Sequence, residues 1–282
     1  MVLESLLNPT IAKKKPFEVF LFGAASSTIA LFLSYWIFRE YSSLIMVFLI
    51  TLASVPLLYF TTTSEEEFDT HPLAEYILLK EHARVLLFLM ALFVGMTLSI
   101  SFWYVVLPHD MTSILFASQS QTIVDINNQI SGNIAHFDIL VRIFFNNMRV
   151  LVFSVIFSFL YGVGALFILA WNATVIAAAI GNSTRKTLAS VAEAVGYHNV
   201  SVYFGAFSFG IFRYLLHGIP EILAYFIGGL AGGIISVAVV NKDLFRVSSD
   251  RIMFDVAELL VIAVALLVIA ALMEVFIIPV IF

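Results

Sequence analysis

The sequence contains several apolar runs that are long enough to cross a lipid bilayer. The first run, at 17–38, has 22 residues, and a transmembrane helix needs about 20. Across the chain, 61% of the residues are hydrophobic and 12% are charged, and the mean hydropathy is +1.03. A water-soluble core could not bury so much apolar side chain. The composition therefore predicts an integral membrane protein.

We interpret seven of these runs as membrane spans. The predicted fold class is all-α: one polytopic α-helical membrane domain over 1–282, with about seven transmembrane spans and at least one short or broken helix. A signal peptide is a poor interpretation of the first run, which is long for one and lacks a small-residue cleavage site after it. The predicted spans are 17–38, 44–60, 85–107, 149–169, 200–216, 222–240 and 254–281.

Four other segments are harder to interpret. Segment 61–84 is acidic at first and then has apolar residues at helical spacing, which predicts an amphipathic surface helix. Segment 108–138 is a long polar loop without Lys or Arg, and we expect a short helix near 118–130. Segment 137–147 is too short to span and is interfacial or re-entrant. Segment 171–181 extends the fourth span as one long helix or forms a broken, re-entrant half-helix.

The distribution of Lys and Arg predicts the orientation of the chain. With a cytoplasmic N-terminus and an extracytoplasmic C-terminus, ten of the fourteen Lys and Arg residues fall on the cytoplasmic side. Segment 61–84 is then cytoplasmic and 108–138 extracytoplasmic, in a multi-pass protein of the cell membrane. The ten are Lys13, Lys14, Lys15, Lys80, Arg84, Arg185, Lys186, Lys242, Arg246 and Arg251.

Arg213, His217 and Glu221 are spaced so that they would share one face of a continuous helix. Gly218 and Pro220 instead predict a tight turn between two spans, with Pro220 in the first turn of the second helix. The three residues have two interpretations. One is a proton- or ion-responsive site inside the membrane. The other is a salt-bridged, capped hairpin at the outer interface.

Three asparagines, Asn146, Asn147 and Asn172, interrupt apolar sequence. Hydrocarbon offers no water to an amide, so each needs a partner in another helix or in exposed backbone. They either coordinate an ion or a polar substrate beside Glu221 or hold helices together.

Two carboxylates, Glu258 and Glu274, occur in the last predicted span. Each is placed near one end of that span. The sequence predicts that Glu258 reaches the membrane interface and that Glu274 reaches the interface or pairs with an arginine, with a proton path as the alternative for either.

Gly228, Gly229, Gly232 and Gly233 form two overlapping pairs with the spacing G-x-x-x-G. Such pairs let a second helix approach closely. We expect internal packing against the fourth or fifth span, and a homodimer is the alternative.

No enzymatic motif is present. The chain has no cysteine, no H-E-x-x-H or G-x-S-x-G motif, and no Gly-rich phosphate loop. His217 and Glu221 alone do not make a metal site. There is also no basic patch with interleaved aromatic residues. The sequence predicts no catalytic residue, no metal, no cofactor and no nucleic-acid partner.

Several short motifs in the central part of the chain carry a family resemblance. In order, they are Phe144-Phe145-Asn146-Asn147, Gly162 and Gly164, Asn172, His217-Gly218-x-Pro220-Glu221, and the small-residue helix at 228–233. Through this order, 85–240 resembles the stage II sporulation protein M (SpoIIM) family of integral membrane proteins. The first two spans and the last lie outside the resemblance.

The resemblance implies a multi-spanning protein without catalytic activity. In endospore-forming bacteria, the family member acts with peptidoglycan-degrading enzymes during engulfment as an anchor or scaffold, and members also occur in organisms that never sporulate, including archaea. The predicted function is therefore a non-enzymatic membrane scaffold for unknown membrane or extracytoplasmic partner proteins. The alternative is a small ion or solute transporter or channel that uses a polar site at broken helices, formed by Asn146, Asn147, Asn172, Arg213, His217 and Glu221.

Overall fold

The computed structural model describes residues 15–69, 75–130, 136–161, 164–195, 200–240 and 249–281. Helices make up nearly all of these residues, and none of the described residues is in a strand, which confirms the predicted all-α class. The first helices are α3 Pro16–Ile37, η1 Arg39–Tyr41, α4 Ser42–Asp69, α5 Glu75–Val106, α6 His109–Leu115 and α7 Ala117–Ile130. They are followed by α8 His136–Tyr161, α9 Gly164–Val195, α10 Val200–Val240, α11 Ser249–Leu272, the π-helical segment η3 Met273–Ile277 and α12 Ile278–Ile281.

Seven helical stretches in the described residues are long and apolar enough to cross a membrane. They are Pro16–Ile37, Arg39–Leu57, Ala83–Val106, Phe137–Phe159, Leu166–Ser190, Gly218–Ser236 and Ile252–Ile281. The number agrees with the sequence prediction, and the first three and the last agree in position. The predicted short helix near 118–130 is confirmed as α7, and the surface helix expected in 61–84 becomes the beginning of α5.

The middle of the chain differs from the prediction. Segment 137–147 is neither interfacial nor re-entrant, because it is the first part of α8. Segment 171–181 lies inside the unbroken α9 and forms part of a span that the sequence analysis did not assign. The predicted span 149–169 thus combines parts of two helices, and residues 162–163 between them lie outside the described residues.

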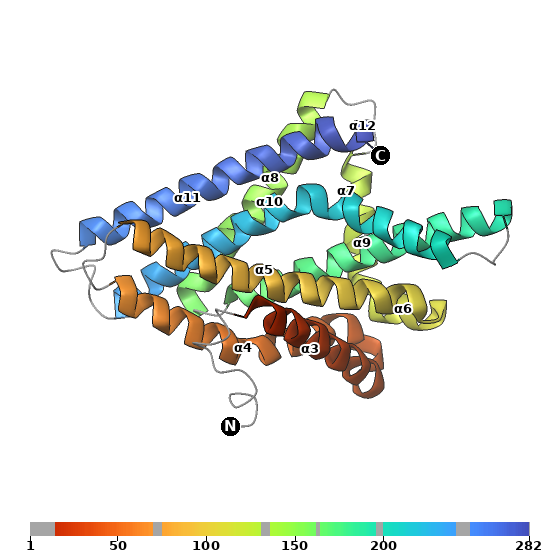
Figure 1. The fold of residues 1–282 in the computed structure, drawn as a ribbon, viewed down its shortest axis with the longest axis horizontal. Coiled ribbons are helices and arrows are strands. Elements are labelled where there is room, and N and C mark those ends of the chain that lie inside the picture. The colour runs from red at the N-terminus through yellow and green to blue at the C-terminus, as the bar shows by residue number, and fades with distance from the viewer. Residues whose placement is uncertain are drawn as a thin grey trace.

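The turn predicted at 217–221 is wrong. α10 is one helix of 41 residues that contains Pro220, and it joins the predicted spans 200–216 and 222–240. A turn inside hydrocarbon would leave backbone groups without partners, whereas a helix satisfies nearly all of them. Pro220 removes only one N–H, and α10 is visibly bent along its length (Figure 1). A Cβ on Gly218 would lie 3.8 Å from Ile176 on α9, an ordinary van der Waals distance, so packing does not require glycine at this position.

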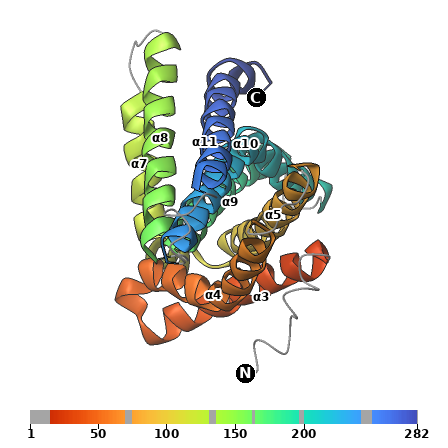
Figure 2. The same ribbon diagram turned by 90° about the vertical axis from the view of Figure 1, so that its left-hand side faces the viewer.

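The helices form an elongated bundle around α9, which contacts α4, α5, α7, α8 and α10 (Figure 1). Viewed along the bundle, α3 and α4 cover one side, and α7 and α8 cover another (Figure 2). α3 packs mainly against α5, whereas α8 and α11 pack against α10. The first two spans therefore lie at the edge of the bundle, away from α11.

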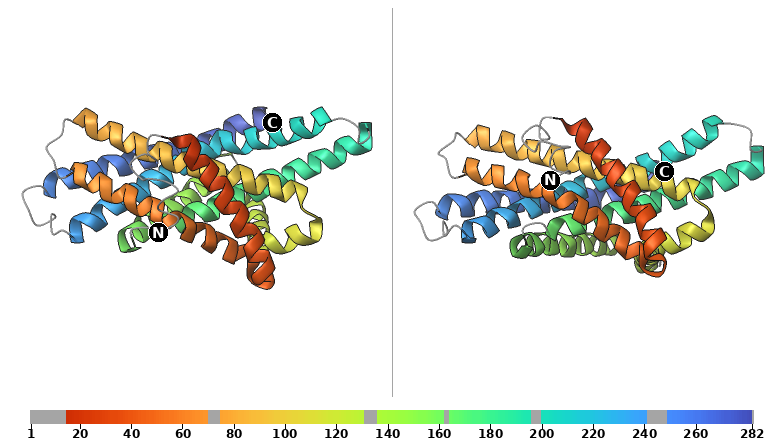
Figure 3. Two further views of the ribbon diagram at one scale, coloured as in Figure 1. Left: turned by 60° about the horizontal axis from the view of Figure 1, so that its bottom comes forward. Right: turned by 90° about the horizontal axis from the view of Figure 1, so that it is seen from below.

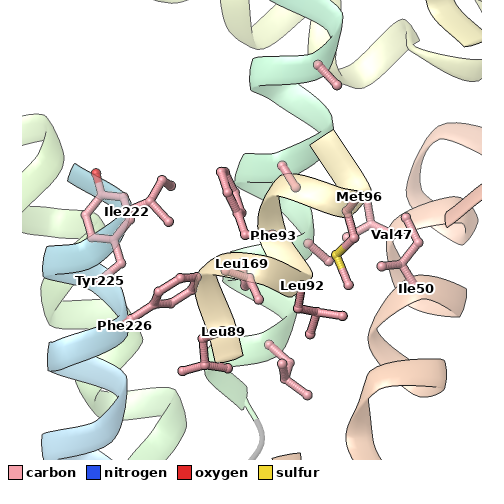
Figure 4. Packing of buried hydrophobic residues seen from close by; sticks show 14 of the residues in the cluster. Val47, Ile50, Leu89, Leu92, Phe93, Met96, Leu169, Ile222, Tyr225 and Phe226 are labelled. Atoms are coloured by element: carbon pink, nitrogen blue, oxygen red, sulfur yellow. The ribbon is translucent and has the colours of Figure 1, made fainter. Parts of the chain in front are cut away.

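The apolar core is built around α5, which lies between α4 and α10. Leu92 and Met96 of α5 lie on the side of Val47 and Ile50 of α4, as Figure 4 shows. On the side of α10, the rings of Phe93 and Phe226 meet edge to face, with centroids 6.2 Å apart and an interplanar angle of 80°. Aromatic pairs favour this geometry, so α5 is held against α10 by shape as well as by area.

Arg185 of α9 joins the end of α5 to the segment that follows it. Its guanidinium donates hydrogen bonds to the main-chain oxygens of Val105 (3.4 Å) and Leu107 and to Thr112 Oγ1 (3.1 Å). It also lies over the ring of Tyr104, 5.2 Å from the ring centroid. A cation at a helix C-terminus satisfies free carbonyl groups and complements the helix dipole.

This contact corrects the predicted sidedness of two cations. The sequence analysis placed Arg185 and Lys186 in a loop opposite 108–138. Both residues are in α9, at the same end of the bundle as α6. Beyond this level, the end of α9 and the beginning of α10 project past the other helices as a helical hairpin (Figure 3). We call residues 186–195 and 200–209 the hairpin tip.

Candidate functional site between α8, α10 and α11

Two polar side chains pair within α10, inside the membrane span Gly218–Ser236. The Tyr225 hydroxyl donates a hydrogen bond of 2.6 Å to Glu221 Oε1, one helical turn earlier. Tyr225 is buried, with 4% of its surface exposed, and Glu221 is partly buried. A hydrogen bond to a carboxylate is stronger than one between neutral groups, so the pair fixes the orientation of the Glu221 side chain.

A second carboxylate, that of Glu274, approaches this pair from η3. Glu274 interacts electrostatically with both Glu221 and Tyr225. It lies in the π-helical segment Met273–Ile277, and π-helical turns inside α-helices are frequent at functional sites. Two acidic side chains from different helices are thus brought together within the bundle.

The pair Glu221–Tyr225 lies well inside the membrane. Phe93 is near the middle of the span Ala83–Val106, and its ring contacts that of Phe226. Glu221 precedes Phe226 by five residues in α10, a rise of about 7.5 Å along the helix. The distance from the middle of the bilayer to its polar surface is about twice this value.

The register between α8 and α10 brings Asn147 to the same level. A Cβ on Gly228 would meet Leu151, and one on Gly232 would meet the Val155 main chain, so the two helices run parallel. Asn147 is one turn before Leu151 in α8. It therefore lies at the level of Tyr225 in α10. Asn147 is 5% exposed, and its amide makes no hydrogen bond with another described residue.

Asn147 faces the interface with α10 and α11. Ile143, one turn before it, packs with Ala271 and Val275 of α11 and η3, and Leu151, one turn after it, packs on Gly228. Residues four positions apart share one face of a helix. Asn147 therefore lies on the face of α8 that packs against α10, α11 and η3, at the level of Tyr225.

The other residues singled out in the sequence do not join this site. Asn146 is exposed, and Asn172 donates a hydrogen bond of 2.8 Å to the Ile168 carbonyl of its own helix. Arg213 lies two turns before Glu221 in α10 and interacts with Tyr214. The backbone of His217 is in α10, and its side chain lies outside the described residues.

Sequence reasoning missed Tyr225 and assigned Glu274 to the interface. A signal for Tyr225 existed, because Glu221 and Tyr225 have the i, i+4 spacing at which helical side chains meet. No local signal connects Glu274 to Glu221, because their electrostatic interaction depends on the packing of α10 on α11. No three His, Cys, Asp or Glu side chains among the described residues are grouped as a metal site.

Gly228 and Gly232, two of the four glycines at 228–233, hold α8 against α10 next to the polar site. Gly232 lies against the Val155 carbonyl, and a Cβ there would also be 3.0 Å from the Ser158 side chain. Gly228 lies against the end of the Leu151 side chain. These glycines pack against α8, the fourth membrane helix of the same chain. Small residues therefore fix the parallel register that positions Asn147.

A second buried polar group lies at the end of the bundle that carries α6 and α7. Gln119 of α7 is fully buried, and its Nε2 donates to the Ser43 carbonyl (3.2 Å) and to Thr174 Oγ1 (3.1 Å). Its Oε1 has no hydrogen-bond partner among the described residues. Ser43 Oγ also pairs with Ser118 Oγ at 2.8 Å. These contacts connect α4, α7 and α9, and we interpret them as structural.

Comparison with known proteins supports one family. The family model for Stage II sporulation protein M matches residues 84–279. The match extends beyond the resemblance at 85–240 and includes α11, whereas α3, α4 and the first nine residues of α5 precede it. A search of curated proteins and a search of solved structures each found no match. Because the family model covers more than half of the sequence, the chain belongs to the Stage II sporulation protein M family of membrane proteins.

Proposed function

We propose that this chain is a non-enzymatic scaffold of the cell membrane, which anchors a membrane or extracytoplasmic partner protein. The observation that carries the proposal is the hairpin tip, formed by α9 and α10, which extends past the rest of the bundle (Figures 1 and 3). Membership of a family of multi-pass membrane proteins is consistent with this role.

The length of the two helices supports a tip that extends beyond the bilayer, with residues 186–190 of the tip still inside the span Leu166–Ser190. Arg185 contacts the end of α5, and α9 continues for ten residues after it, a rise of about 15 Å. A Cβ on Gly210 would lie 3.0 Å from Thr184 Oγ1, so residues 200–209 of α10 accompany this extension. α10 alone, with 41 residues, has a length of about 61 Å, twice the thickness of the hydrocarbon core.

Aromatic side chains on the tip provide the proposed docking surface. Phe204 is 75% exposed, Phe209 is exposed, and Phe212 continues this exposed stretch toward the bundle. Aromatic area facing water is costly at roughly 25 cal/mol per Å², and contiguous exposed apolar area marks interaction sites. A partner protein that covers the tip would remove this cost.

The orientation that we propose keeps the N-terminus cytoplasmic and the C-terminus extracytoplasmic. Arg185 and Lys186 lie at the end of the bundle that carries α6 and are therefore counted as extracytoplasmic. Eight of the fourteen Lys and Arg residues then remain on the cytoplasmic side instead of ten. The excess is smaller but has the same sign. The hairpin tip is then extracytoplasmic.

Photo-crosslinking in native membranes tests the proposal. A photoreactive residue at Phe204 is compared with one at Val261, which is 69% exposed in the middle of α11. We expect protein adducts at position 204 and lipid adducts at 261. Phe209→Ser should reduce the protein adduct, whereas Phe254→Ser, at an exposed site of α11, should leave it unchanged. Lipid adducts alone at 204 would place the tip in the bilayer and contradict the scaffold.

Ion transport is the second candidate function, and the acidic site in the membrane favours it. Ionisable side chains inside spans are rare and often mark ion or proton pathways. Ion flux through the purified chain in proteoliposomes is the test. Flux that is lost in Glu221→Gln while the fold is kept would support transport, and absence of flux for every ion tested would exclude it.

A further inference from the structure

We propose that Glu221, Tyr225, Glu274 and Asn147 form an exchangeable binding site for a small hard cation between α8, α10 and η3. The cation is a proton or a metal ion held by oxygen atoms. This site goes beyond the scaffold role and does not depend on it. Its residues come from three helices, so an occupant would tie these helices together.

Charge is the first argument. Glu221 and Glu274 are close enough to interact electrostatically, and they lie in membrane-spanning helices. Two carboxylates in a medium of low dielectric constant cannot both remain charged unless positive charge compensates them. Among the described residues, the groups that act on these two carboxylates are Tyr225 and the carboxylates themselves. A bound cation supplies the missing compensation.

The helices around the site bring few other titratable groups. α9 over 164–184 and α5 over 85–103 contain none. The exposed Asp138, Arg142 and Arg149 on α8 are on its surface, and Asp255 and Glu258 are near the opposite end of α11 from Glu274. On α10, Arg213 and Tyr214 are about two turns from Glu221, and His217 is one turn from it. The experiment below therefore includes the variant His217→Gln as a control.

The Asn147 amide is the second, independent argument. It is nine-tenths buried, faces the site, and makes no hydrogen bond with another described residue. A buried amide that lacks a protein partner costs free energy, unless an ion or a water supplies one. Its carbonyl oxygen is a suitable ligand for a hard cation.

The donor atoms define the class of ligand. Two carboxylates, one phenol and one amide offer oxygen atoms only, which bind protons and hard metal ions rather than soft ones. Glu274 lies in a π-helical segment, whose wider turn changes the direction of its side chains relative to an α-helix. A local return from π to α would move Glu274 relative to Glu221, so the geometry of the site can differ between occupied and free forms.

The first experiment measures the melting temperature of the purified full-length chain in detergent. It uses pH 5 to 9, with sodium, lithium, potassium or calcium chloride compared with choline chloride at equal ionic strength. We expect a metal ion or acidic pH to raise the melting temperature of the wild type by several degrees. Glu221→Gln with Glu274→Gln should remove this response, because neutral amides need no cation. Glu258→Gln and His217→Gln are the controls and should keep it.

The comparison of salts and pH values distinguishes a bound metal ion from a bound proton. Stabilisation by one metal ion at constant pH identifies a metal site, and stabilisation by acid alone identifies a proton site. An equal response in the wild type and the double variant would overturn the proposal, as would the absence of any response in the wild type.

A second measurement uses the wild type alone, in case the double variant does not fold. Hydrophobic carbodiimides label protonated carboxyl groups within membranes, and mass spectrometry identifies the labelled residue. We expect labelling of Glu221 or Glu274 that increases as the pH falls and, for a metal site, decreases several-fold with the stabilising ion. Unlabelled Glu221 and Glu274 under every condition, or labelling that neither pH nor ions change, would contradict the proposal.

Discussion

Gly232 of α10 faces the main-chain carbonyl of Val155 on α8 so closely that a methyl group at 232 would overlap the oxygen. Because backbone cannot move aside as a side chain can, Gly232→Ala should force the two helices apart. We expect a loss of about 1–3 kcal/mol of stability, as for other overpacked interfaces, measured by unfolding in detergent.

Gly205 is the matched control for Gly232, because it is in the same helix and a Cβ there meets no atom of the described residues within 4 Å. Gly205→Ala should be neutral or stabilising by up to about 1 kcal/mol, from helix propensity alone. Equal effects at the two positions would mean that the close packing of α8 on α10 does not determine stability.

Replacement of Arg185 should destabilise the end of α5. Lysine keeps the charge but replaces the two terminal guanidinium nitrogens that donate to Val105, Leu107 and Thr112 with a single ammonium nitrogen. We therefore expect Arg185→Lys to cost about 1–3 kcal/mol, nearly as much as Arg185→Gln. The exposed neighbour Lys186 is the control, and Lys186→Gln should change the melting temperature little.

Gln119→Leu should separate α7 from its neighbours. The change removes the two hydrogen bonds to Ser43 and Thr174 and leaves the buried Ser43 carbonyl without this donor. A loss of about 1–3 kcal/mol is expected. Gln121 pairs with Asp125 on the exposed face of the same helix, so Gln121→Leu should have a much smaller effect. Protease sensitivity within α7 would report the separation directly.

Tyr225→Phe should weaken the acidic site without changing the shape of the core. Loss of the hydroxyl removes the hydrogen bond to Glu221, at a cost of about 1–3 kcal/mol for a bond to a charged group. A double-mutant cycle with Glu221→Gln measures this coupling. If the two single changes add without coupling, the pair does not act as a unit.

The length of the apolar runs was sufficient to predict the fold class and the spans at both ends of the chain. A span depends on local composition, and 17–38 and 254–281 need no information about their neighbours. Gly218 and Pro220 misled the prediction, because local turn preference was weighed without the cost of an open backbone in hydrocarbon. The helix continues through both residues.

The candidate site could be predicted only in part. Asn147 and Glu221 stand out as polar residues in apolar sequence, and both face the site that we describe. Glu274 stands out equally, but its approach to Glu221 depends on how α11 packs on α10. The proximity of Arg185 to Leu107 likewise depends on the parallel register of α5 and α9, which no single helix encodes.

Because α10 is one continuous helix, a change of bend at one residue moves the far end of the helix. Pro220 leaves the Leu216 carbonyl without its usual N–H donor, so the helix is most easily flexed beside Glu221. The arm from Pro220 to Phe204 has a length of about 24 Å, and a change of roughly 10° at this fulcrum would swing Phe204 by about 4 Å. A small angular adjustment deep in the bilayer would thus be amplified into a displacement beyond its surface.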